Sequence, residues 1–208
     1  TYNKLRIATY NIHDFSYTDA YNRAAQYVKT NNIDIIVMEE IQTNDMAPFF
    51  SALTNKGITN MIYTNISTSQ ISTNDEFDDR LAVFSKYPIS SASEVCYSGY
   101  TSVQDPSRTS CYWNIQNYLR PTLRFKVTAY SKEIWFYANH LKAETSCNAG
   151  SGCYADYCIS QRRAQAHAVE EYIKSNHNEE NELIVVLGDM NTAQNPQDFT
   201  YSIGGDNS

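Results

Sequence analysis

Short apolar runs that end abruptly in polar side chains are the feature that most limits how this chain can fold. In LIVVLGDMNT, residues 183–192, five apolar residues are followed by glycine, aspartate and asparagine. DIIVMEEI, residues 34–41, likewise ends in two glutamates before its last isoleucine. Runs of this length suit strands, and their continuous apolar composition indicates strands covered on both faces. The sequence therefore predicts buried strands whose ends carry acids and amides.

Further strands and helices alternate along the chain. Strands are expected at 4–12, at 80–89 and in a β-hairpin made of 121–130 and 132–143. Apolar residues at helical spacing predict helices at 19–32, 45–56 and 161–176. Thr18 is the expected cap of the first helix, and Tyr27 is among its inward-facing residues. Loops rich in polar residues are expected at 61–77, where they alternate with short β-like pieces, and at 90–119 and 145–160.

This pattern indicates one mixed α/β domain over residues 1–208, with helices covering a β-sandwich or a central sheet. A hydrophobic content of 42% in 208 residues is enough for a substantial core. No run of eighteen or more apolar residues occurs, so no membrane-spanning helix is expected.

The formal net charge of −7 bears on the class of partner. A protein that only binds nucleic acid usually carries a basic excess, so the charge is evidence against that class. It is weaker evidence against a nuclease, because divalent cations can bridge protein carboxylates to a phosphate.

Five cysteines, at 96, 111, 147, 153 and 158, fit no common zinc pattern. Three of them lie in a segment rich in Gly, Ser and Asn. Loop disulfides in an exported protein are the leading interpretation, which predicts a secreted or periplasmic location. Reduced thiols in a cytosolic protein remain the alternative.

Four expected strands end in groups that an apolar core would not choose: Asn11, Glu40, Asn139 with His140, and Asp189 with Asn191. Taken singly, each is more often a turn residue, a solvated acid or a structural histidine. Together they have the chemistry of a site, because carboxylates and amides suit Mg²⁺ or Ca²⁺ and histidine suits proton transfer near neutral pH. We therefore expect these side chains to share one cleft.

The remaining candidates near these motifs receive structural roles. His13 is expected to be structural or to support the site indirectly, and His167 and His177 are expected at the surface. Successive strand residues point to opposite faces, so only one of Glu39 and Glu40 is expected to face the cleft.

The motifs TYNIH, DIIVMEEIQ, RLAVFSKYPI, NHLKA with QRRAQAHAVEEYI, and VVLGDMNT follow one another along the chain. In this order they resemble the endonuclease/exonuclease/phosphatase superfamily, over about residues 4–195. NHLKA followed by a cysteine-containing loop and RRAQA looks most like secreted bacterial nucleases of that superfamily. The resemblance implies the α/β fold of deoxyribonuclease I, a four-layer β-sandwich flanked by helices.

Carried over residue by residue, the resemblance implies that Glu40 ligates a divalent metal, Mg²⁺ in first place or else Ca²⁺ or Mn²⁺. Asn11 beside it would bind metal or phosphate. His140 would protonate the leaving oxygen or hydrogen-bond the scissile phosphate, and Asp189 and Asn191 would orient the attacking water and a phosphate oxygen.

Three further residues complete the implied site. Arg120 matches an arginine before the hairpin and would contact phosphate through its planar guanidinium. Asp79 stands where deoxyribonuclease I has a carboxylate that orients the histidine. Lys142 is a candidate for another phosphate contact.

The favoured hypothesis is a metal-dependent phosphodiesterase that acts on nucleic acid, DNA above RNA, by in-line attack of an activated water. A second reading is hydrolysis of a phospholipid or inositol phosphate on the same scaffold, because loops decide the substrate. A third is an inactive binding module. Retention of Glu40, His140, Asp189 and Asn191 speaks against the third.

In the superfamily, further strands follow the GDMN-type motif and carry an Asp and a closing Asp-His pair, which have no counterpart before Ser208. The expectation is a domain incomplete at its C-terminus, whose remaining portion would act as its partner and cover an open strand edge.

Residues 1–208 alone are therefore predicted to be inactive, because the histidine that activates water in the superfamily is not among them. The measurement is nicking of plasmid DNA by the purified 208-residue chain with Mg²⁺. Nicking that EDTA abolishes would contradict the prediction.

Overall fold

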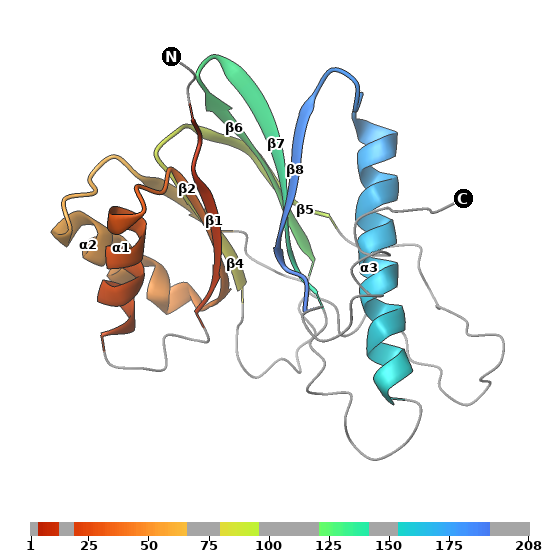
Figure 1. Ribbon diagram of the computed structural model, residues 1–208, viewed down its shortest axis with the longest axis horizontal. Coiled ribbons are helices and arrows are strands. Elements are labelled where there is room, and N and C mark those ends of the chain that lie inside the picture. Colours follow the sequence, from red (N-terminus) through yellow and green to blue (C-terminus); the bar gives the residue numbers. More distant parts are fainter. Residues whose placement is uncertain (1–3, 13–18, 66–79, 96–120, 142–153, 192–208) are drawn as a thin grey trace.

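Two β-sheets packed face to face form the centre of the molecule, and helices cover the outer face of each (Figure 1). The computed structural model describes residues 4–12, 19–65, 80–95, 121–141 and 154–191. Within them the layers are helix, sheet, sheet and helix, so the expected four-layer α/β sandwich is confirmed.

The first sheet has the strand order β1-β2-β4-β3. Its strands, in that order, are Ile7–Asn11, Ile35–Ile41, Arg80–Ser85 and Ile62–Asn65. Helices α1 (Ala20–Thr30) and α2 (Met46–Asn55) cover its outer face. A 3-10 turn, η2 (Thr43–Asp45), leads into α2.

The second sheet has the order β5-β6-β7-β8. Its strands are Ile89–Val95, Thr122–Ala129, Lys132–His140 and Leu183–Asp189. One long helix, α3 (Tyr154–Asn176), runs along its outer face (Figure 1). The expected hairpin is confirmed as β6 and β7, and the turn between them has positive φ angles at Tyr130 and Ser131.

Each sheet contains one parallel pair joined through a helix. β1 and β2 are parallel on either side of α1, and β7 and β8 are parallel on either side of α3. Parallel strands end at the same edge of a sheet, so Asn11 lies opposite Glu39 and His140 lies opposite Asp189. The connectivity alone therefore brings the polar strand ends together in pairs.

The apolar layer between the sheets holds the two halves together. Phe125 and Phe136 are both fully buried and stack at 4.9 Å between ring centroids. Around them pack aliphatic side chains from both sheets: Ile35, Val37, Leu81, Val83, Leu123, Val127 and Ala138. This layer fixes how one sheet lies on the other.

The helices pack on the outer faces of the sheets through two further apolar clusters. Under α1 and α2, Phe49 meets Phe84 edge to face at 4.8 Å. Under α3, Tyr137 packs with Val169 and Ile173. Among the described residues, no helix is long and apolar enough to cross a membrane.

The prediction of one strand at 80–89 is wrong, because β4 ends at Ser85 and β5 begins at Ile89 in the other sheet. The predicted loop at 90–119 is wrong at its start, because β5 extends to Val95. Among the described strands β5 lies at the edge of its sheet, its middle residues are exposed, and its pairing with β6 shifts register between Ser90 and Ser93. A strand with one solvated edge and one solvated face tolerates serine, so its composition looks like that of a loop.

The ends of two helices also differ from expectation. α3 begins at Tyr154, so helix replaces the last part of the loop predicted at 145–160. Asp19, at φ 73°, precedes α1 in the cap position, whereas Thr18 lies outside the described residues. Tyr27 was predicted to face inward but is 41% exposed and packs on Tyr10 of the edge strand β1.

The cysteine prediction stays untested. Cys158 lies on α3, and the other four cysteines lie outside the described residues, as do the disulfides proposed for them.

Phe136→Ala is predicted to lower the free energy of unfolding by about 3–5 kcal/mol, because it opens a cavity in the layer that joins the sheets. Chemical denaturation measures the change. Lys29→Ala, on the exposed face of α1, should stay within about 0.5 kcal/mol of the parent protein. A loss below about 1 kcal/mol for Phe136→Ala would contradict this account of the core.

Candidate active site

The layer between the sheets becomes polar at one end. Along each strand alternate residues face this layer, so the inward rows of apolar side chains continue into polar ones. Ile7 is followed on β1 by Thr9 and Asn11, and Val37 is followed on β2 by Glu39. On the second sheet the inward rows of β7 and β8 end in His140 and Asp189.

A β-bulge at the end of β2 adds a second glutamate to this group. The pairing of β2 with β4 shifts register between Glu39 and Ile41, and Glu40 has a φ of 58°. The extra residue interrupts the alternation of faces. Glu39 and Glu40 therefore both face the polar end of the layer, and the prediction that only one of them could do so is wrong.

Side chains from four strands meet around Asn11. Its Nδ2 donates to Glu40 Oε1 at 3.0 Å and to Asp189 Oδ2 at 3.3 Å. Glu40 Oε1 lies 3.5 Å from His140 Nε2. Four residues that the sequence separates by up to 178 positions thus form one contact network, as expected from their places at strand ends.

His140 is the most enclosed member of this network. It is 3% exposed, whereas the Glu40 side chain is 18% exposed and reaches solvent. An imidazole held beside a carboxylate in a dry setting is suited to proton transfer, because its orientation is fixed and water competes little for its proton.

Glu39 lies one layer deeper and is fully buried. Thr9 Oγ1 donates to Glu39 Oε1 at 2.7 Å, while Glu39 Oε2 has no hydrogen-bond partner among the described residues. Burial raises the pKa of the Glu39 carboxyl to about 7; the hydrogen bond from Thr9 opposes this shift and the nearby charge of Asp189 adds to it. In the sequence, the only indication that this acid is buried is its place in an apolar strand, on the face that points inward.

Asp189 and Asn191 are tied to the end of β7. Leu141 N donates to Asp189 O at 2.9 Å, and Asn191 Nδ2 donates to Leu141 O at 2.7 Å. Asn191, at φ 52°, also donates its backbone N–H to Asp189 Oδ1 at 2.9 Å. Asn191 therefore holds the two strand ends together, in addition to any role toward phosphate.

Asp79, Arg120 and Lys142, the other predicted site residues, lie outside the described residues, and so does His13. His167 is exposed at 56% of its side chain, as expected.

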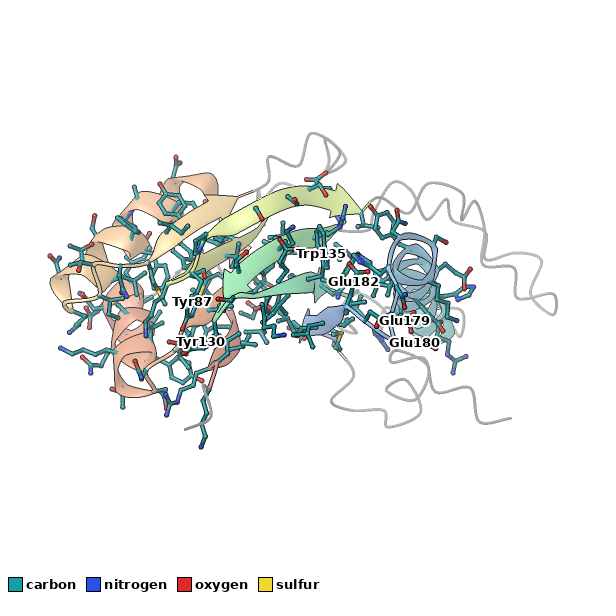
Figure 2. The ribbon with its side chains drawn as sticks, turned by 90° about the horizontal axis from the view of Figure 1, so that it is seen from above. Tyr87, Tyr130, Trp135, Glu179, Glu180 and Glu182 are labelled. Carbon is teal, nitrogen blue, oxygen red and sulfur yellow. The ribbon has the colours of Figure 1, made fainter. Side chains whose placement is uncertain are left out.

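His177 was predicted at the surface, but its side chain is only 2% exposed. It bonds to the Tyr137 hydroxyl and to Glu182, and its ring packs on Trp135. Figure 2 labels Trp135 and Glu182. The residue follows a helix directly, and sequence position could not show that the chain turns back onto the sheet there.

The donor set at the polar end fits a divalent cation with few protein ligands. Glu40 and Asp189 supply carboxylates and Asn11 an amide, all within one network. In the part of the chain that the structure describes, no group of three or more His, Cys, Asp and Glu side chains is arranged to hold a metal. Mg²⁺ is typically held by one or two carboxylates together with water and substrate phosphates, so it suits this set better than Zn²⁺ does.

The buried Glu39 predicts a pH dependence of stability. In the unfolded chain this carboxyl titrates near 4.5 and in the folded protein near 7, so between these values the folded state binds the extra proton. The free energy of unfolding should therefore fall by about 3 kcal/mol as pH rises from about 4.5 to about 7. Glu39→Gln should remove this decline.

The measurement is chemical denaturation of the parent protein and of Glu39→Gln at several pH values in EDTA. Glu180→Gln, at an exposed glutamate in the turn before β8 (Figure 2), is the matched control and should leave the decline intact. Parallel pH curves for the parent protein and Glu39→Gln would contradict the prediction.

Solved structures with the same fold cover nearly the whole chain. The mannosyl-6-phosphatase of Bacteroides thetaiotaomicron superposes with a TM-score of 0.63 at 18% identity, over 96% of this chain and 70% of its own. A β-hairpin deletion mutant of beta toxin from Staphylococcus aureus gives 0.66 at 14% identity, over 97% and 72%. D. rerio TDP2 complexed with a single-strand DNA product gives 0.55 at 15% identity, over 90% and 60%. At these identities the likeness concerns the fold.

No curated protein matches the chain. The sequence profile of the Endonuclease/Exonuclease/phosphatase family matches residues 8–205, which is nearly the entire chain. Members of this family hydrolyse phosphoesters, generally with a divalent metal ion. The profile match, together with the shared four-layer fold, shows that this chain belongs to the Endonuclease/Exonuclease/phosphatase family.

Proposed function

We propose that this protein is a divalent-metal-dependent phosphodiesterase that hydrolyses nucleic acid, with DNA as the favoured substrate. The observation that carries the proposal is the single contact network of Asn11, Glu40, His140 and Asp189, built from four different strands. Carboxylates, an amide and one enclosed imidazole are the groups that metal-assisted phosphoester hydrolysis needs.

Glu40 and Asp189 would hold the cation at the open end of the layer between the sheets. When bound, Mg²⁺ neutralises charge on the phosphate and stabilises the oxygens of an in-line displacement. Asn11, which already contacts both carboxylates, keeps them within reach of one ion.

His140 supplies the proton for the leaving oxygen. Its Nε2 lies 3.5 Å from Glu40 Oε1, so the imidazole is placed beside the carboxylate proposed to hold the cation. Asp189 orients the attacking water, and Asn11 and Asn191 hydrogen-bond the oxygens of the phosphate. Arg120 and Lys142 are proposed as further phosphate contacts, and Asp79 as the carboxylate that orients His140.

Two considerations support nucleic acid as the substrate. NHLKA followed by a cysteine-containing loop and RRAQA resembles secreted bacterial nucleases, and one similar structure, that of D. rerio TDP2, contains a single-strand DNA product. With a net charge of −7, the protein would depend on the cation and on local cationic side chains to hold a polyanion. Cleavage should therefore depend steeply on the concentration of Mg²⁺.

The prediction is that the full gene product cleaves plasmid DNA with Mg²⁺ and not with EDTA. His140→Asn should lower kcat by about 10²–10⁴-fold, because the proton donor is lost while the fold is retained. Glu40→Gln should shift the Mg²⁺ requirement to higher concentrations and lower kcat. The control Glu180→Gln, at an exposed glutamate, should leave both unchanged.

The same assay is run on RNA, sphingomyelin, a soluble inositol phosphate and mannose 6-phosphate. Cleavage of DNA that EDTA abolishes and that Glu40→Gln lowers would support the proposal. Hydrolysis of a lipid or of a small phosphate ester alone would overturn the proposed substrate but keep the metal site. Activity in EDTA, or full activity of Glu40→Gln, would overturn the metal site itself.

A further inference from the structure

A buried side-chain amide lies one residue before His140. Asn139 is 2% exposed, and its Oδ1 accepts a hydrogen bond from Thr122 Oγ1 at 2.6 Å. Its Nδ2 donates to Tyr137 O at 3.0 Å and to Leu187 O at 3.3 Å. Both donor hydrogens and the carbonyl oxygen of the amide thus serve the protein, and they connect β6, β7 and β8 at one level.

Asn139 does not point into the candidate active site. Adjacent strand residues face opposite sides, so His140 faces the layer between the sheets while Asn139 faces α3. There it lines a cavity of about 480 Å³ together with Val169, Ile184 and Val186. Any influence of Asn139 on the chemistry must therefore pass through the backbone of β7 and β8.

The backbones of β7 and β8 come unusually close at this level. Asn139 pairs with Gly188, whose φ is +126°. A Cβ on Gly188 would lie 1.9 Å from the Asn139 carbonyl oxygen, so no other residue fits without moving the strands apart. Asp189 is the next residue on β8, so the close approach of the two strands at Gly188 also determines where Asp189 lies.

Among the described residues, β7 is the strand that pairs with β8. On this side the last residues of β8 are held by three kinds of contact: the backbone ladder, the hydrogen bond from Leu141 N to Asp189 O at 2.9 Å, and the Asn139 amide. The side-chain hydrogen bond from Asn139 to Leu187 O thus adds to the backbone ladder between β7 and β8.

We propose that Asn139 is a positioning residue of the active site, which together with Thr122 fixes the ends of β7 and β8 so that His140 and Asp189 stay in register. Its catalytic consequence rests on the proposed function. Residues that orient a catalytic group without touching the substrate typically contribute about 10–100-fold to activity. A displacement of about 1 Å between reacting groups can cost about 10²-fold in rate.

Two variants each remove one partner of the hydrogen bond between Thr122 and Asn139. Asn139→Ala removes the amide, and Thr122→Val removes the hydroxyl that orients it while keeping the volume of the side chain. The full gene product carrying Asn139→Ala should lose about 10–100-fold in kcat, and that carrying Thr122→Val about tenfold, with KM changed little. Thr122→Ser keeps the hydroxyl and should restore kcat.

Tyr137→Phe is the matched control. Tyr137 lies two residues earlier on β7, faces the same side and loses its hydrogen bond to His177 in this variant. It should lower the thermal midpoint without changing kcat at temperatures where the protein is folded. If Thr122→Val and Asn139→Ala also keep the parent kcat per folded molecule, Asn139 is only structural and the proposal is overturned.

A readout without substrate separates this proposal from the proposed function. The imidazole ¹⁵N signals of His140, assigned with His140→Asn, should shift in Asn139→Ala and Thr122→Val and stay in place in Tyr137→Phe. Unchanged His140 signals in the first two variants would overturn the proposal. If the parent protein hydrolyses no phosphoester, the proposed function fails, and the His140 signals alone then decide on Asn139.

Discussion

The apolar contact between the inner faces of the two sheets determines where every group of the candidate site lies. Phe125 and Phe136, stacked at its centre, belong to the same layer that farther along contains Thr9 and Asn11 on one sheet and His140 on the other. Close packing in such a layer allows one mutual orientation of the sheets. The side chains at the end of the layer are therefore positioned by apolar packing in which they take no part.

The direction of the strands brings the polar strand ends of each sheet together. In each half of the sandwich a helix returns the chain so that a second strand runs parallel to the first, and parallel strands end at the same edge. Each sheet thus contributes a pair of polar ends, Asn11 with Glu39 and His140 with Asp189. Packing the sheets then joins two pairs into one site.

The same end of the molecule carries features that cost stability. Glu39 is a fully buried acid with its pKa raised to about 7, and Glu40, Gly188 and Asn191 have positive φ angles of 58°, 126° and 52°. Polar burial and unusual backbone angles often gather at active sites, where geometry matters more than local stability. Asn139 supports this end of the molecule from the face of the sheet toward α3, and every polar group of its amide is engaged in a hydrogen bond.

The sequence by itself determined the buried strands, the helices and the strand-end positions of Asn11, Glu40, His140 and Asp189, because apolar periodicity reports which face a residue takes. Only the tertiary structure decided that Ser91 belongs to an edge strand, that His177 is enclosed, and that a bulge turns both Glu39 and Glu40 toward the site. Periodicity carries no information on which strands pair or where their register slips. Those choices follow from contacts between segments far apart in the chain, and a single sequence does not record them.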